Sequence, residues 1–99
     1  MSDNLLWLLN WSHAHYNEKL GINKGIKIST IDNPGWSLKV SLIETEFEYQ
    51  SFKAIEINRS DDNWIYCSVE EKIFKGYGGS FNLPEILEIF REWVEHCQK

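Results

Sequence analysis

The sequence predicts an α+β domain in which an antiparallel sheet of about five strands carries an N-terminal and a C-terminal helix on one face. Three observations favour this fold class. Apolar residues recur at helical spacing near both ends of the chain, they alternate with polar residues through its middle, and turn-forming residues separate the alternating runs. The 99 residues are expected to form a single domain over 1–99, because half of such a chain would bury too small a core to fold alone.

The first predicted element is a helix over roughly residues 3 to 19. Ser2, Asp3 and Asn4 are residue types that cap helices, and Gly21 is of the type that ends them. The apolar residues of this segment cover more than one stripe of the helix; they are Leu5, Leu6, Leu8 and Leu9 with Trp7 and Trp11. Because this surface is so broad, an aromatic flank is expected to stay partly exposed or to meet a second surface.

The middle of the chain predicts two β-hairpins and a fifth strand. "GIKIST" and "WSLKVSL" alternate on either side of the turn "DNPG", and form the first hairpin. Its predicted buried face holds Ile26 and Ile28 on one strand and Trp36, Leu38, Val40 and Leu42 on the other. "FKAIEINRS" and "NWIYCSVEE" form the second hairpin across "RSDDN", and a short strand around "KIFKGY" follows.

Strand phase in the second hairpin separates its aromatic residues from its core. Ile65, Cys67 and Val69 fit the buried face, so Trp64 and Tyr66 are expected to point to the opposite, polar face.

A second helix closes the chain in "NLPEILEIFREWVEHC". Asn82 and Glu85 form a predicted N-x-x-E capping box, and the apolar stripe of the helix consists of Leu83, Ile86, Leu87, Phe90, Trp93, Val94 and Cys97. This stripe is expected to dock on the apolar face of the sheet, which leaves the other face open to water or to a partner.

Charge and cysteine usage restrict the possible partners and compartments. The net charge of −5 argues against nucleic acid, which is bound through clustered Lys and Arg, and it suits a basic protein partner. The two cysteines form no CxxC pair, and the apolar run in "MSDNLLWLLNW" is too short for a signal peptide or a membrane span. A cytoplasmic protein that does not bind a membrane is therefore expected.

The residues favour neither an enzyme nor a metal or cofactor site. His13 and His15 are two apart on a predicted helix and project in different directions. Cys67 falls in a buried strand, where a thiol is inert. "GYGGS", at 76–80, lacks the lysine and the spacing of a phosphate-binding loop, and is interpreted as a strand-to-helix connection.

The open sheet face is the predicted partner-binding surface. Trp64 and Tyr66 are its predicted anchors, since exposed Trp and Tyr among polar groups are the residue types of interface hot spots. The alternative is that both pack under a loop or against the first helix. The predicted electrostatic complement comprises Asp61 and Asp62 in the second turn, Glu44, Glu46 and Glu48 in the preceding loop, and Asp32 at the tip of the first hairpin.

The ordered motifs "LLWLLNWSHAHYN", "GIKISTIDNPGWSLKVSL", "IEINRSDDNWIYCSVE" and "FKGYGGSFNLPEILEIFREWV" resemble the immunity protein 53 family of bacterial polymorphic toxin systems. The resemblance spans nearly the whole chain. It implies a cytoplasmic protein that binds and neutralises a cognate toxin. Inhibition by occlusion would need no cofactor, a monomer or weak homodimer is expected, and a basic nuclease is one toxin that an acidic domain would suit. Two alternatives stay open: a small hydrolase or sulfur-transfer enzyme that uses Cys67, and a homodimeric structural domain whose open face pairs with itself.

Overall fold

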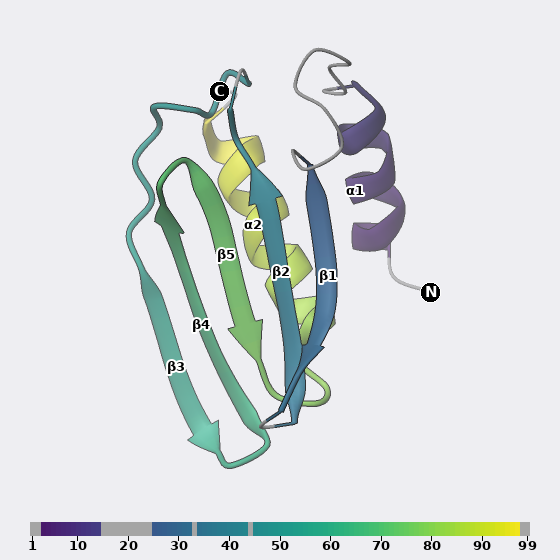
Figure 1. Ribbon diagram of the computed structural model, residues 1–99, viewed down its shortest axis with the longest axis vertical. Helices are drawn as coiled ribbons and strands as arrows, with labels where there is room; N and C mark the ends of the chain where they lie inside the picture. The colour runs from purple at the N-terminus through teal and green to yellow at the C-terminus, as the bar shows by residue number, and fades with distance from the viewer. Residues whose placement is uncertain (1–2, 15–24, 33, 44, 98–99) are drawn as a thin grey trace.

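One antiparallel sheet with both helices on the same side forms the protein (Figure 1). The computed structural model describes residues 3–14, 25–32, 34–43 and 45–97. The elements are α1 (Asp3–Ala14), β1 (Ile26–Ile31), β2 (Gly35–Ser41), β3 (Ile55–Ser60), β4 (Asn63–Glu70), β5 (Ile73–Gly78) and α2 (Leu83–Cys97). The strands lie in the order β1-β2-β5-β4-β3, and every neighbouring pair is antiparallel. The predicted α+β fold is confirmed.

The core lies between the sheet and the helices and is built around the apolar stripe of α2. Phe90 is fully buried, and its ring centroid lies 4.9 Å from that of Phe74 on β5 and 5.2 Å from that of Trp11 on α1. Ile86 and Val94 on the same stripe are also fully buried. Trp36 lies on the same face of β2 as Leu38, as the strand phase predicts, but it is only half-buried. Its Nε1 donates to the Ser80 carbonyl at 3.1 Å.

The packing of α1 differs from the prediction. Trp7 and Trp11 face α2, where they stack on each other and meet the Phe90 ring edge to face, whereas Leu6 and Leu9 are 60% and 59% exposed. The exposed flank is therefore aliphatic and not aromatic, because the large rings fill the space beside Phe90. Residues 15–19, the predicted end of this helix, lie outside the described residues.

The outer strand β1 is covered less than predicted. Ile28 lies opposite the fully buried Leu38, yet it is exposed. The reason is that α1 packs beside α2 (Figure 1) and does not cover the side chain of Ile28 on this outer strand. Ile26 and Ile28 share the helix-side face by register, as predicted, but Ile26 is only half-buried and Ile28 is less buried than Ser29 on the opposite face. The predicted burial of Ile28 is therefore wrong.

The turn between β4 and β5 has no signature in the sequence. Glu71 and Lys72 both adopt positive φ, 54° and 64°, in a two-residue connection of the kind that matches the twist of a hairpin. Asn and Gly are the usual residues at such positions. Two contacts hold Lys72 there. Its Nζ forms an ion pair with Glu48 at 3.1 Å and lies over the ring of Tyr49, 4.8 Å from the ring centroid.

Two glycines of β5 let α2 lie close to the sheet. Gly76 and Gly78 are buried on the helix side of the strand, and a β-carbon on Gly76 would lie 2.5 Å from Cγ2 of Ile86. The glycines of "GYGGS" thus serve close packing, and the segment ends in the connection to α2, as predicted. In the described ranges, no helix is long and apolar enough to cross a membrane.

Candidate functional site

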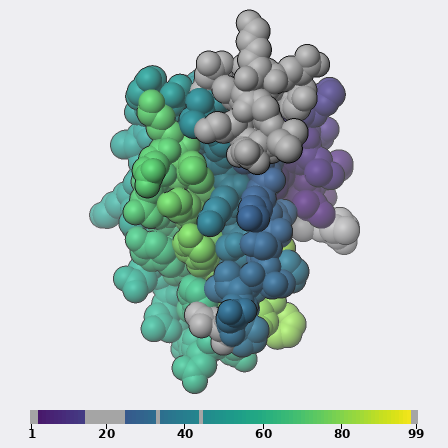
Figure 2. Space-filling model, viewed as in Figure 1, coloured from purple at the N-terminus to yellow at the C-terminus, as the bar shows by residue number. Residues whose placement is uncertain are grey.

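The open face, by which we mean the sheet face away from the helices, carries the two predicted aromatic anchors. Along β4, Ile65 and Cys67 are buried toward α2, whereas Tyr66 is 38% exposed and Trp64 is half-buried. Figure 2 looks onto this face, where side chains of the strands form the surface and α1 appears only at the margin. The predicted strand phase is confirmed, and Trp64 and Tyr66 do not pack against α1.

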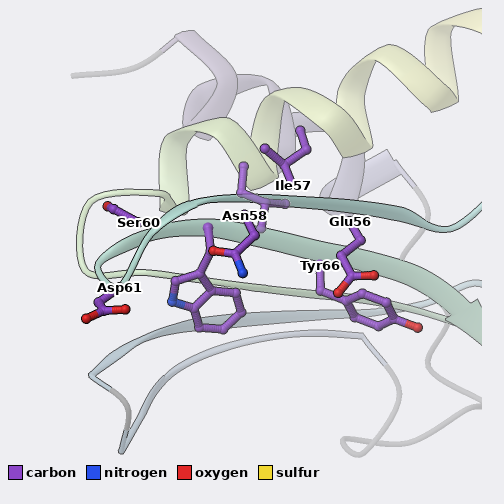
Figure 3. A pocket seen from close by; sticks show the side chains of 8 residues that line it. Glu56, Ile57, Asn58, Ser60, Asp61 and Tyr66 are labelled. Carbon is purple, nitrogen blue, oxygen red and sulfur yellow. The ribbon is translucent and has the colours of Figure 1, made fainter.

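A hollow of about 330 Å³ lies on the open face at the β3–β4 edge of the sheet. Figure 3 shows Glu56, Asn58 and Tyr66 on its open side, with Ile57 pointing back toward the helices. The full lining is Glu56, Ile57, Asn58, Ser60, Asp61, Trp64, Ile65 and Tyr66. The hollow therefore joins both aromatic anchors to one of the predicted carboxylates, Asp61.

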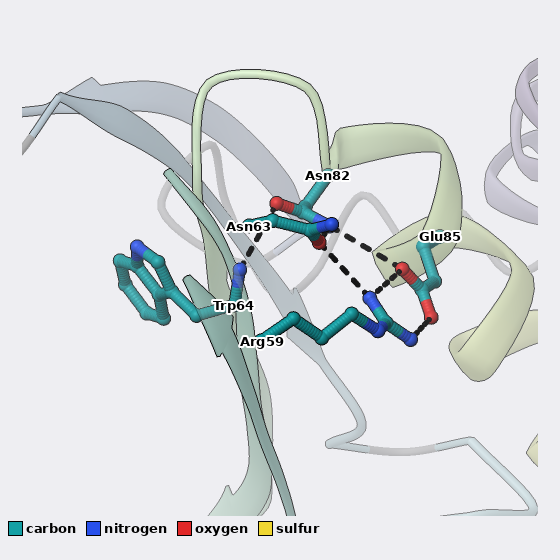
Figure 4. Close-up of polar contacts among 5 residues, drawn as sticks. All are labelled: Arg59, Asn63, Trp64, Asn82 and Glu85. Atoms are coloured by element: carbon teal, nitrogen blue, oxygen red, sulfur yellow. Dashed lines mark hydrogen bonds and ion pairs between the residues drawn. The ribbon is translucent and has the colours of Figure 1, made fainter. Parts of the chain in front are cut away.

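The start of α2 holds the backbone of Trp64. The Oδ1 atom of Asn82, a buried residue just before the helix, accepts the Trp64 N–H at 3.3 Å (Figure 4). The Gly79 N–H donates to the Trp64 carbonyl at 3.1 Å. The Asn82 Nδ2 atom donates to Asn63 Oδ1 at 3.1 Å and to Glu85 Oε1 at 3.3 Å. The predicted capping box is therefore wrong in its contacts: Asn82 and Glu85 bond side chain to side chain, and Asn82 Oδ1 accepts from the sheet, so that Asn82 ties the start of α2 to Trp64.

An ion pair fastens the β3–β4 hairpin to the same place. Arg59 donates from Nη1 to Glu85 Oε1 at 3.0 Å and from Nη2 to Glu85 Oε2 at 2.9 Å, and Nη1 also donates to Asn63 Oδ1 at 3.0 Å (Figure 4). The hydrogen bonds from Arg59 lower the pKa of the Glu85 carboxyl. Because both side chains are partly exposed, this pair positions the hairpin more than it stabilises the fold. Arg59 has no part in the sequence prediction, since its partner lies 26 positions away.

The structure separates the predicted acidic residues into two groups. Asp61 and Asp62 form the β3–β4 turn, and Asp32 lies in the β1–β2 turn at the same end of the sheet (Figure 1). Glu46 and Glu48 lie in the loop at the opposite end, where Glu48 pairs with Lys72. The eight residues of β4 separate the ends by roughly 25 Å at about 3.3 Å per residue. Glu44 lies outside the described residues.

The thiol of Cys67 is poorly suited to nucleophilic chemistry. Cys67 is fully buried beneath α2, and this burial raises its pKa from 9.0 to about 12. The thiolate, which is the reactive form, is therefore scarcer by about a thousandfold at neutral pH than for an ordinary thiol. Within the described residues, no three His, Cys, Asp or Glu side chains gather to hold a metal ion.

Native thiol reactivity checks the burial of Cys67. In a Cys97→Ser variant, Ellman's reagent is expected to leave Cys67 unmodified at pH 8 until urea unfolds the protein. The matched Cys67→Ala variant is expected to react at once through the half-buried Cys97. Rapid modification of the folded Cys97→Ser protein would contradict the prediction that the Cys67 thiol is inert. It would favour the alternative hypothesis of an enzyme that uses Cys67.

The fold and the site define a class of protein: a small α+β domain with one sheet face covered by helices and the other open around two aromatic side chains. The chain belongs to the Immunity protein 53 family, whose family model matches residues 5–95. It is an immunity protein by family, and this membership implies a toxin partner. No curated protein and no solved structure matches the chain.

Proposed function

We propose that this chain binds a cognate bacterial toxin in the cytoplasm through its open face and neutralises it by covering the toxin's active site. The observation that carries the proposal is the position of Trp64 and Tyr66 beside an open hollow, on the one sheet face that the helices leave uncovered. Large aromatic side chains on a rigid strand supply contact area with little loss of side-chain entropy. Inhibition by occlusion requires no cofactor and no catalytic residue.

Carboxylates at one end of the sheet supply the proposed electrostatic complement. Asp61, Asp62 and Asp32 lie at the end of the sheet where β4 begins, and together they form an acidic margin for a basic toxin surface such as a nuclease cleft. Glu46 and Glu48 lie at the far end of the sheet, and Glu48 is already paired with Lys72. Any contact that these two residues make with the toxin is therefore separate from the one around Trp64 and Tyr66. In the absence of toxin, a monomer or weak homodimer is expected.

Co-expression with the toxin encoded by the neighbouring gene tests the function. Cells that produce the toxin together with this chain are expected to survive, and the purified chain is expected to inhibit the toxin in vitro at a one-to-one ratio, because one open face covers one active site. Full toxin activity in the presence of excess folded chain would refute the proposal. Light scattering of the free chain at several concentrations separates this function from a structural homodimer.

A further inference from the structure

We infer that the toxin surface docked on the β1-β2-β5 half of the open face is acidic, an inference that rests on the proposed function. The observation is a row of three lysines across adjacent strands, Lys27, Lys39 and Lys75, which we call the lysine row. It sits on a chain whose net charge is −5. The overall charge therefore does not describe the charge of this half of the face.

The register of the sheet places the lysines side by side. Lys27 on β1 is the direct partner of Lys39 on β2, and Lys39 is the direct partner of Lys75 on β5. Directly opposite residues point to the same face, with their β-carbons about 5 Å apart. Lys27 and Lys39 are exposed and Lys75 is half-buried, so the ammonium groups share one strip of the surface.

The lysine row lacks a neutralising carboxylate among the described residues. The described ion pairs of the chain join Arg59 to Glu85, Lys72 to Glu48 and Arg91 to Glu95, and none includes a lysine of the row. The carboxylates of β3 and β4 on this face have other partners: Glu56 lies opposite Tyr66, and Glu70 accepts a hydrogen bond at 3.4 Å from Ser68, the direct partner of Lys75, without an ion pair to Lys75 itself. Like charges directly opposite each other destabilise a sheet, so a partner that brings carboxylates relieves a repulsion present in the free protein.

The neighbouring row of the sheet favours a protein as the occupant. One step along the strands, the register aligns Ser29, Ser37, Tyr77, Tyr66 and Glu56. Ser37 is buried and its hydroxyl bonds to that of Ser29 at 2.8 Å, whereas Tyr66 is exposed and Tyr77 is half-buried. The two tyrosine hydroxyls beside the lysines suit an acidic protein surface, to which they can donate hydrogen bonds. A polynucleotide would instead carry its phosphates from the lysine row onto Glu56 and Asp61, in a chain that is acidic overall.

The open face is therefore divided in charge, and the division predicts the pattern of its partner. Carboxylates of the toxin face the lysine row, whereas its basic residues face Asp61 and Asp62 beyond Trp64. Such a divided contact fixes the orientation of the two proteins, because a rotated complex would bring like charges together.

A titration with defined anions tests the lysine row without the toxin. In NMR spectra at low salt, a hexaglutamate peptide is expected to shift the amides around Lys27, Lys39 and Lys75, and oligothymidine is expected to bind more weakly. The double variant Lys39→Gln, Lys75→Gln is expected to lose about tenfold in affinity for hexaglutamate. It is expected to unfold at the same urea concentration or a higher one, because a repulsion has been removed. The matched control is Lys53→Gln, an exposed lysine beside α2, which is expected to keep the affinity.

Three results of this titration would overturn the inference: unchanged hexaglutamate affinity in the double variant, a lower urea midpoint, which marks the lysines as structural, or tighter binding of oligothymidine. With the toxin itself, Lys39→Glu combined with Lys75→Glu is expected to slow association at low salt about tenfold or more. If the wild-type chain leaves the toxin active, the proposed function fails. If the wild type neutralises the toxin and the charge-reversed variant associates equally fast, only the acidic partner surface is refuted.

Discussion

Replacing Trp64 and Tyr66 together by alanine is expected to weaken toxin binding by at least about a hundredfold, because hot-spot aromatics contribute about 2 kcal/mol or more each. Both side chains project from the open face, outside the core formed with α2. The variant is therefore expected to fold, with a circular-dichroism spectrum like that of the wild type. Calorimetric titration with the toxin measures the affinity, and survival of toxin-producing cells measures the biological effect.

A tyrosine elsewhere on the surface serves as the control. Tyr49 is 84% exposed and lies at the opposite end of the sheet, beside Lys72. Tyr49→Ala removes the same kind of side chain as Tyr66→Ala and is expected to leave toxin affinity unchanged. If the folded double variant protects cells and binds the toxin as well as the wild type does, the toxin is bound by another surface.

Phe90→Ala is expected to lower the free energy of unfolding by about 3 to 5 kcal/mol, the usual cost of removing a fully buried phenylalanine. The Phe90 ring contacts the rings of Trp7 and Trp11 on α1, of Phe74 on β5 and of Trp93 on α2 itself. Its removal opens a cavity where both helices and the sheet meet. For a domain stabilised by about 5 to 15 kcal/mol, this is a large fraction of the total.

Urea unfolding followed by tryptophan fluorescence measures this loss. Phe81→Ala is the matched control, because Phe81 is 86% exposed, and it is expected to change the free energy of unfolding by less than about 0.5 kcal/mol. A Phe90→Ala protein that unfolds at the wild-type urea concentration would show that α1 and α2 do not share the core described above.

Periodicity predicts the parts of this fold in which one face of an element is buried. The apolar stripe of α2 and the alternation of β4 are strong signals, because most apolar residues in these two elements are buried or half-buried and most polar ones are exposed. Cys67, Tyr66 and Phe90 therefore lie as expected. The orientation of α1 is less predictable, since its own apolar residues cover more than one side of the helix. The tryptophans face inward because their large rings fill the space beside Phe90. The turn at Glu71 and Lys72 gave no signal, because its backbone is held by contacts from a distant loop.

For the candidate site, the sequence predicts which side chains share the open face but not how they group. Strand phase places Trp64 and Tyr66 there, whereas residue type alone groups Glu46 and Glu48 with Asp61 in one predicted electrostatic complement. The lysine row and the contact of Asn82 with Trp64 depend on strand order and on helix docking. Both are long-range properties that local patterns do not encode.

The central position of β5 has a consequence for how the chain acquires its structure. β1 with β2, and β3 with β4, can form hairpins locally, but an isolated two-stranded hairpin is marginal in water. Pairing of Trp36 with Gly78 joins them and closes a loop of about forty residues, which makes the β2–β5 ladder the slow, non-local step of folding. During synthesis the two halves of the sheet therefore stay unjoined until β5 emerges, and α2 follows at once to cover them. The open face exists as one surface only after β5 has been made and has paired with both of its neighbours.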